Sequence, residues 1–342
     1  MMATGRRSSV STVLRNSIST YGIVWFTAAL FIGLALTTDR FLSEANLRNV
    51  LDQQSTLLIA ASAATITMIA GGFDLSISAT AITAPLVTLR VENATGNIPL
   101  AVLAGVLTGV AIGVVNGVVV SYLRINAFIA TLATSFIVFG IGFIVSDRSI
   151  LRADNPDFTK LARTRWLGIT TATWIALVVV IVAWAVLTRT RFGQHVFATG
   201  GNPEAAMLAG VRVRLITAST FAIAGLGAGM AGVLRASRAT SAQASDDFSF
   251  IFGVIAAIVV GGTSIAGGEG AIWRTVIGAA VIAFMVNGLN LHQIDPIYQR
   301  FIQGAVILVA VGIDTWSGTA RSPRATSGPP PESPSTQPAQ AH

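Results

Sequence analysis

Long apolar runs without charged residues follow one another along most of the chain. A helix that crosses a hydrocarbon core of about 30 Å needs roughly 20 residues, because each residue adds ~1.5 Å. The windows that lack Asp, Glu, Lys and Arg are 16–38, 53–73, 75–89, 93–123, 125–146, 166–188, 215–234, 248–268, 275–294 and 301–313. Their apolar residues are continuous rather than alternating, which favours helices over a β-barrel. The pattern predicts an all-α, polytopic transmembrane helical bundle with about ten spans, of which 75–89 and 301–313 are the shortest.

The two ends of the chain differ from this apolar core. Three arginines precede the first apolar run, which favours a cytoplasmic N-terminus. Counted over the whole chain, however, the basic residues do not choose an orientation, since eleven would lie on each side. Six of the 11 prolines lie near the C-terminus, among Ser, Thr and Gln, a composition typical of disorder. We predict a cytoplasmic tail (1–19), a transmembrane domain (20–317) and a disordered cytoplasmic tail (318–342).

Composition supports this reading and excludes several classes of protein. Apolar residues make up 53% of the 342 residues and charged residues 11%, and the mean hydropathy is +0.70. A soluble globular protein or a disordered chain carries far more charge. The absence of Cys excludes disulfides, a Cys-ligated zinc site and a thiolate nucleophile. The net charge of +7 comes from scattered arginines, whereas a nucleic-acid-binding face would cluster them.

Motifs for nucleotide binding or catalysis are missing from the sequence. The one lysine, Lys160, is followed by Leu161, so the chain has no P-loop for ATP. Gly227, Gly229 and Gly232 form a Gly-x-Gly-x-x-Gly pattern, but inside an apolar window rather than after a strand. Gly225 and Gly229, and likewise Gly109, Gly113 and Gly117, are spaced four residues apart. We interpret all of these glycines as contacts between helices. The three histidines are dispersed, without metal-ligand spacing. We therefore expect no enzyme activity, bound metal or cofactor in this chain.

The loop 189–214 contains a short helix with a signal at each end. Asn202 is a favourable N-cap, Pro203 suits the first helical position, and Glu204 complements the positive end of the helix dipole. Gly210 suits the position after the C-cap. Such a short, capped helix among basic residues has the form of a docking element. The alternative is a helix lying on the bilayer surface.

Polar residues also interrupt the apolar windows. The sequence Gly-Gly-Phe-Asp-Leu-Ser at 71–76 places Asp74 between two windows, and the helix that follows is short if it ends near Arg90. Transporters place polar groups at such broken helices. The alternative is a plain turn with Asp74 as a helix N-cap. Asn116 and Asn287 lie within apolar windows, where an amide either bonds between helices or lines a polar path.

Taken in order, these segments resemble the permease family of bacterial ABC importers for ribose, xylose and related sugars, over about residues 20 to 315. The resemblance lies in Phe41 with 46–51, 71–76, 116–117 with 128–132, 200–202 with Ala205, Ala206 and Gly210, 261–264, and 287–289. Three positions depart from the family pattern. Ala127 replaces a proline, Phe73 replaces an aliphatic residue, and a Trp-Arg pair at 273–274 stands where small residues are common.

The resemblance implies a homodimer around a central path in the bacterial cytoplasmic (inner) membrane. It also implies a cytoplasmic ABC ATPase, which holds the ATP and Mg and docks on the helix at 202–210, and an extracytoplasmic solute-binding protein. The implied ATPase-coupling residues are Asn202, Pro203, Glu204, Ala205, Ala206 and Gly210. Our candidates for lining the path are Asp74, Ser76, Asn116, Phe128, Thr131 and Asn287.

The function implied is therefore the membrane-spanning permease subunit of an ATP-driven importer of a small polar solute, most simply a monosaccharide. The alternative is a secondary transporter driven by an ion gradient. Such proteins usually keep several ionisable residues inside the bilayer for coupling, whereas here Asp74 is almost alone.

Overall fold

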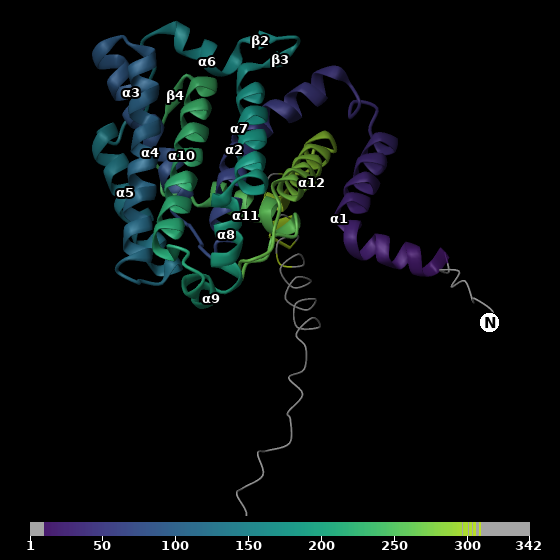
Figure 1. Cartoon of the computed structure of the whole chain (residues 1–342). Helices are drawn as coiled ribbons and strands as arrows, with labels where there is room; N and C mark the ends of the chain where they lie inside the picture. The colour runs from purple at the N-terminus through teal and green to yellow at the C-terminus, as the bar shows by residue number, and fades with distance from the viewer. Residues whose placement is uncertain (1–9, 296, 300, 303, 306–307, 309–342) are drawn as a thin grey trace, which may run out of the picture.

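The computed structural model describes residues 10–295, 297–299, 301–302, 304–305 and 308, and shows a helical bundle with two small two-stranded sheets (Figure 1). The helices are α1 (Val10–Thr37), α2 (Glu44–Ile69), α3 (Ile77–Thr95), α4 (Ile98–Ser121), α5 (Ala127–Ser146), the 3₁₀ turn η1 (Pro156–Thr159), α6 (Lys160–Arg163), α7 (Thr171–Arg189), α8 (Arg191–Gly201), α9 (Pro203–Leu208), α10 (Val213–Ala239), α11 (Ser249–Val260) and α12 (Ile272–Leu291). The strands are β1 (Leu151–Arg152), β2 (Arg165–Trp166), β3 (Ile169–Thr170) and β4 (Ser241–Ala242), paired antiparallel as β1–β4 and β2–β3.

The described residues do not cover both ends of the chain. The predicted tail 318–342 and most of the window 301–313 lie outside them. At the other end, α1 begins at Val10, so a helix covers part of the segment 1–19 that we predict as a tail.

Five of the described helices are long and apolar enough to cross a membrane, namely α4, α5, α7, α10 and α12. Two shorter apolar helical stretches are Ile23–Thr37, within α1, and α11. The structure therefore confirms an all-α fold with several candidate membrane spans. The predicted number of about ten spans is not confirmed.

The helices α2 and α3 are long enough to span, but their polar residues keep them out of this group. In α2 every residue of 59–69 is buried, including Ser62 and Thr65. The Thr65 hydroxyl bonds to the Ala61 carbonyl oxygen at 2.6 Å and lies 2.8 Å from the Thr275 hydroxyl of α12. A helix buried on all sides is surrounded by protein rather than lipid. The Thr65 hydroxyl therefore finds its partners within the bundle. Because such buried polar residues lower the mean hydropathy of α2, hydropathy alone does not register the helix as a span.

The helix α3 continues past the charge-free window 75–89 because its charged residues have partners. The Glu92 side chain is buried, and its carboxylate accepts hydrogen bonds from the backbone amides of Asp154 and Asn155 at 3.1 and 2.8 Å. The Arg90 Nε donates to a carbonyl oxygen at the end of α5 at 2.6 Å. These charges hold the loop after α5 against α3, and the helix does not end near Arg90 but continues to Thr95.

Small residues bring α4 and α10 into direct backbone contact. A Cβ atom added to Gly109 would lie 2.4 Å from the carbonyl oxygen of Gly225, and one added to Gly225 would lie 2.2 Å from the carbonyl oxygen of Gly109. Gly113 and Gly117 approach α10 as closely, one and two turns further along α4. The structure thus confirms that these glycines serve helix packing.

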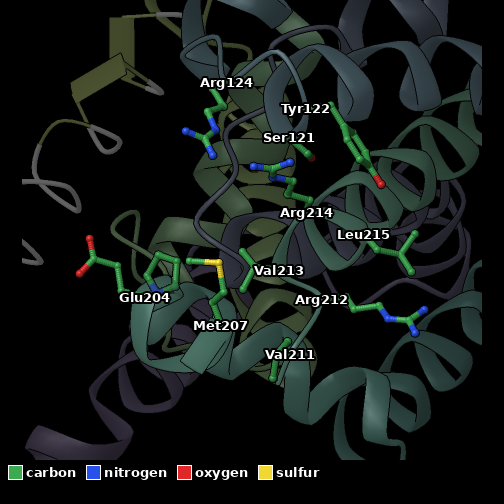
Figure 2. Close-up of a pocket in the computed structure, with 11 residues that line it drawn as sticks. Ser121, Tyr122, Arg124, Glu204, Met207, Val211, Arg212, Val213, Arg214 and Leu215 are labelled. Carbon is green, nitrogen blue, oxygen red and sulfur yellow. The ribbon is translucent and has the colours of Figure 1, made fainter. Parts of the chain in front are cut away.

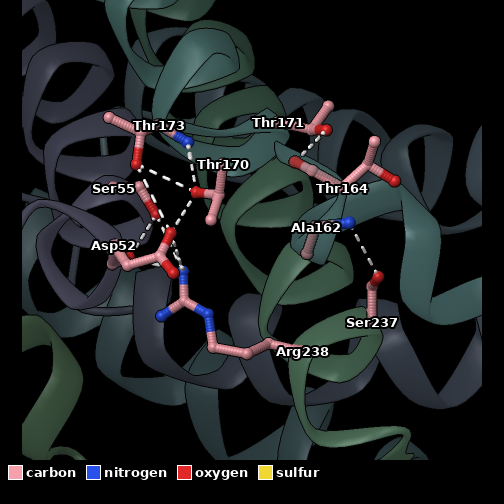
Figure 3. Close-up of polar contacts among 9 residues, drawn as sticks. All are labelled: Asp52, Ser55, Ala162, Thr164, Thr170, Thr171, Thr173, Ser237 and Arg238. Atoms are coloured by element: carbon pink, nitrogen blue, oxygen red, sulfur yellow. Dashed lines mark hydrogen bonds and ion pairs between the residues drawn. The ribbon is translucent and has the colours of Figure 1, made fainter. Parts of the chain in front are cut away.

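A polar cluster ties three segments together at the end of the bundle where α6, β2 and β3 lie (Figure 3). The Asp52 carboxylate of α2 accepts hydrogen bonds from the hydroxyls of Thr170 and Thr173, at the start of α7. Arg238 of α10 donates to the Asp52 carbonyl oxygen and to the Ser55 hydroxyl, the latter at 2.9 Å. Its Nη2 also lies 4.0 Å from the Asp52 carboxylate, and both side chains are 25% exposed.

We expect Arg238→Met to lower the free energy of unfolding by about 1–2 kcal/mol, because it removes charge-assisted hydrogen bonds from partly buried acceptors. The measurement is thermal unfolding of the purified protein in detergent. Arg152→Met is the control, since Arg152 is exposed and lies in β1, opposite Ser241 of β4, which follows α10 directly. Equal melting temperatures for the two variants would contradict a stabilising role for the cluster.

Candidate functional site

A short polar loop, residues 71–76, joins α2 to α3 inside the bundle. Asp74 is 7% exposed, and its Oδ1 accepts hydrogen bonds from the Ser76 amide at 2.9 Å and the Ser76 hydroxyl at 2.6 Å. The Ser76 hydroxyl oxygen in turn accepts a hydrogen bond from Asn116 Nδ2 of α4, at 2.7 Å. Three of the predicted path residues therefore form one chain of hydrogen bonds.

This arrangement corrects the alternative interpretation of Asp74 as a helix N-cap. The helix α3 begins at Ile77, and Ser76 holds the N-cap position without a capping bond from its side chain. The Asp74 carboxylate instead bonds two residues ahead, which closes a turn before the helix starts. Its conformation therefore orders the loop rather than the helix end.

The helix α5 contacts the same loop through two more of the predicted residues. The Thr131 hydroxyl accepts a hydrogen bond from the Leu75 amide at 3.0 Å and donates to the Ala127 carbonyl oxygen at 2.7 Å. The ring of Phe128 lies 6.2 Å from the ring of Phe73, centre to centre. The loop thus bonds to α4 and α5 together, and the family departure at Phe73 is the residue that meets Phe128.

Two acceptor atoms of this cluster have no hydrogen-bond partner within the part of the chain that the structure describes. They are Asp74 Oδ2 and Asn116 Oδ1, and both are buried. Buried acceptors in native proteins almost always have a donor. A water molecule or a hydroxyl-bearing solute supplies such donors, so the site has unused capacity for groups of this kind.

Asn287, the sixth candidate, lies elsewhere. It is on α12, and its amide pairs with the amide of Asn46 at the start of α2. Asn46 Nδ2 donates to Asn287 Oδ1 at 3.0 Å, and Asn287 Nδ2 donates to Asn46 Oδ1 at 2.8 Å. Because this pair satisfies one donor and one acceptor on each side chain, it serves as a bond between helices. The structure does not bring Asn287 to the other five residues.

The short helix predicted in the loop 189–214 is α9. The Asn202 Oδ1 accepts a hydrogen bond from the Ala205 amide at 3.0 Å, and Pro203 occupies the first turn. At the other end Gly210 has a φ of 86°, and its amide and that of Val211 donate back to the last turn, each at 3.0 Å. This pattern is a Schellman C-cap. Both predicted caps of the helix are therefore confirmed.

The two faces of α9 differ sharply. Ala206 is 4% exposed, whereas Met207 is 63% and Leu208 90% exposed. Figure 1 places α9 at the end of the bundle opposite to β2 and β3. The helix thus rests on the bundle through one small residue and presents apolar side chains outward. Glu204 and Ala205 are exposed as well.

Glycines connect α9 to the Asp74 loop through backbone contacts, at a point we call the glycine node (Gly71, Gly200, Gly267 and Gly268). The Gly268 amide donates to the Ile69 carbonyl oxygen, at 2.8 Å. A Cβ on Gly200 would lie 1.8 Å from that oxygen, and one on Gly267 would lie 2.8 Å from the Cα of Gly71. The end of α2, the end of α8 and the loop before α12 therefore meet without intervening side chains.

The helix α8, which precedes α9 directly, is not among the elements predicted from the sequence. Thr190 caps it by accepting a hydrogen bond from the Gly193 amide at 3.2 Å. Val196 and Thr199 are buried on one face, and Phe192 packs beside Val196. The spacing of 192, 196 and 199 is helical. Together with a threonine before the first turn it was a usable signal.

Comparison with known proteins assigns the chain to a family. A family described as "Branched-chain amino acid transport system / permease component" matches residues 46–311. The L-arabinose transport system permease protein AraH of Escherichia coli (strain K12) is 35% identical over 88% of this chain and 92% of its own length. The ribose import permease protein RbsC of Haemophilus influenzae is 37% identical (86% and 93%), and the D-allose transport system permease protein AlsC of Escherichia coli is 32% identical (86% and 91%).

No solved structure matches the chain significantly. The relatives confirm the resemblance to sugar permeases that the motifs indicate, and they are transport permeases rather than enzymes. Together with the apolar helices, they identify a multi-pass membrane protein. The chain belongs to this permease family.

Proposed function

We propose that this chain is the permease subunit of an ATP-driven importer, and that it forms the path for a monosaccharide across the bacterial cytoplasmic membrane. The observation that carries the proposal is the similarity, over most of the chain, to permeases named for arabinose, ribose and allose. In this proposal the chain binds no cofactor. A cytoplasmic ATPase binds ATP and Mg, a solute-binding protein delivers the sugar from outside, and two permease chains surround the path.

The buried cluster of the 71–76 loop suits the handling of a sugar. A monosaccharide is neutral and rich in hydroxyl groups, which donate hydrogen bonds. Asp74 Oδ2 and Asn116 Oδ1 are acceptors without a partner among the described residues. In the proposed cycle, α3 moves against α4 and α5. This movement exposes the two acceptors to the solute first from one side of the membrane and then from the other. Phe73 and Phe128 then offer apolar ring faces to the sugar.

The helix α9 is the proposed site of ATPase docking. Its exposed Met207 and Leu208 fit an apolar contact with a partner, while the buried Ala206 fixes it to the bundle. The glycine node joins the end of α8 to the start of the Asp74 loop. A shift of α9 driven by the ATPase therefore reaches the proposed path through backbone contacts.

The test of the function is uptake by proteoliposomes that contain the permease together with the ATPase and the binding protein of the same organism that assemble with it. We expect uptake of one of L-arabinose, ribose or allose that requires ATP. Leucine is the control solute, because the family description names branched-chain amino acids. Uptake that an uncoupler abolishes while ATP depletion leaves it unchanged would favour the ion-gradient alternative and contradict the proposal.

The coupling assignment is tested with a matched pair of variants. Leu208 is 90% exposed on α9 and Leu167 is 92% exposed between β2 and β3, at the opposite end of the bundle. We expect Leu208→Arg to prevent the ATPase from copurifying with the permease, because it places a charge in an apolar contact. Leu167→Arg should leave copurification unchanged. Equal recovery of the ATPase with both variants would refute docking on α9.

A further inference from the structure

A cavity of about 560 Å³ lies beside α9, where α4 ends and α10 begins (Figure 2). The end of α4 and the segment after it contribute Ser121, Tyr122 and Arg124. The helix α9 contributes Pro203, Glu204 and Met207, and the segment leading into α10 contributes Val211, Arg212, Val213, Arg214 and Leu215. The cavity is therefore shared between the proposed docking helix and two of the candidate membrane spans.

The charge of this cavity is positive. Three arginines and one glutamate line it. In Figure 2 the side chains of Arg124 and Arg214 are directed toward the same side of the cavity, whereas that of Arg212 points away from them. Neither the Arg124 nor the Arg214 side chain has a hydrogen bond or ion pair within the described part of the chain. Two guanidinium groups that share one cavity repel each other until an anion lies between them.

The donors suit a phosphate group in particular. A guanidinium binds phosphate oxygens through two parallel hydrogen bonds. The hydroxyl of Ser121 is buried at the cavity wall and has no partner among the described residues. It is a further donor, and it lies on the last residue of α4. An unused buried hydroxyl beside two unpaired arginines indicates an absent polar ligand rather than a bare surface.

The surroundings of the cavity indicate that the phosphate belongs to a lipid. The helix α4 is a candidate membrane span, and only 22% of the residues in its most apolar window are buried in the bundle, so one face of the helix is open. Tyr122, at its end, is 49% exposed, Leu123 is 63% exposed, and Leu215 across the cavity is 48% exposed. Tyrosine at the end of a span is typical of the level of the lipid headgroups. The apolar side chains there can contact the acyl chain of a lipid. A free phosphate ion has no apolar part that would contact them.

We propose that this cavity binds the headgroup phosphate of an acidic phospholipid of the inner leaflet, through Arg124, Arg214 and the Ser121 hydroxyl. Only the assignment to the inner leaflet rests on the proposed function. If the ATPase docks on α9, the end of the bundle that holds this cavity faces the cytoplasm. A lipid in this position contacts Pro203, in the first turn of α9. It therefore supports the docking helix from the side of the membrane.

The experiment uses the purified permease–ATPase complex, stripped of lipid in detergent and titrated with phosphatidylglycerol. Native mass spectrometry counts the lipids that remain bound. We expect one tightly held phosphatidylglycerol per permease chain, with an affinity about fivefold lower after Arg124→Gln or Arg214→Gln and about 25-fold lower in the double variant. Arg191→Gln is the matched control, because Arg191 is exposed at the same end of the bundle but does not line the cavity.

Two further titrations distinguish the source of the phosphate. Phosphatidylcholine carries the same phosphate without net charge and should bind more weakly. Inorganic phosphate should displace phosphatidylglycerol only at far higher concentration. Equal loss of lipid in Arg191→Gln, or displacement by inorganic phosphate as readily as by lipid, would overturn the proposal. Loss of the ATPase from the double variant with an unchanged lipid count would overturn it too, because the arginines would then contact the protein partner.

The lipid count is independent of transport. A complex that imports sugar but binds phosphatidylglycerol equally in all variants would refute the lipid site alone. A complex that binds the lipid through these arginines but does not take up sugar with ATP would refute the transport proposal and leave the lipid site in place.

Discussion

Replacement of Gly225 with leucine is expected to prevent α4 from packing on α10 and to leave little folded protein in the membrane. A Cβ at Gly225 would lie 2.2 Å from the carbonyl oxygen of Gly109 and 2.9 Å from the Cα of Gly113. These are backbone atoms, so no side chain can rotate to make room, and the helices must separate along their whole contact. We expect a loss of more than about 3 kcal/mol in the free energy of unfolding.

Size-exclusion chromatography and thermal unfolding of the purified protein measure this effect. The matched control is Gly140→Leu, because Gly140 also lies in a candidate membrane span, α5, but a Cβ there meets nothing within 4 Å. We expect that variant to elute and unfold like the unchanged protein. A normal elution profile and melting temperature for Gly225→Leu would contradict the direct backbone contact between α4 and α10 at this residue.

Local sequence signals predicted the local structure well. The caps of α9 are an example, since Asn202, Pro203 and Gly210 act only on the backbone of neighbouring residues. The glycine spacing in α4 and α10 likewise predicted close packing. It did not identify the partner helix, because one glycine-rich face fits any other of the same spacing.

What could not be predicted depends on which helices meet. Asn116 and Asn287 look alike in the sequence, each being an amide in an apolar window. Only the fold shows that Asn116 bonds to Ser76 of the 71–76 loop, while Asn287 bonds to Asn46. The length of α3 depends in the same way on a distant loop, whose backbone amides satisfy Glu92. A hydropathy pattern places the end of a span at such a charged residue, because the pattern contains no information about partners that are distant in the sequence.

The glycine node carries the second large prediction. Gly268 donates its amide hydrogen to the Ile69 carbonyl oxygen at 2.8 Å, and Gly200 lies against both atoms. A Cβ on Gly200 would lie 1.8 Å from that oxygen and 2.6 Å from the Gly268 nitrogen. Even alanine must therefore push α8 away from the end of α2. If the node transmits the movement of α9 to the Asp74 loop, Gly200→Ala breaks that connection at its centre.

We expect Gly200→Ala to keep the ATPase bound and hydrolysing ATP while sugar uptake falls. The ratio of sugar imported to ATP hydrolysed should drop roughly 5- to 150-fold, which corresponds to a lost coupling free energy of ~1–3 kcal/mol. Both rates are measured in the same proteoliposomes, so a simple loss of folded protein lowers them together and leaves the ratio unchanged. The ratio therefore separates transmission of movement from stability.

The neighbouring residue provides the control for this prediction. Gly201 is adjacent in α8, yet a Cβ there meets nothing within 4 Å. Gly201→Ala makes the same chemical change at the end of the same helix, so it should leave the ratio as it is in the unchanged protein. If Gly200→Ala also leaves the ratio unchanged, the contact between α8 and α2 is only structural. The movement of α9 must then reach the Asp74 loop by another route, of which its packing on α10 is the nearest.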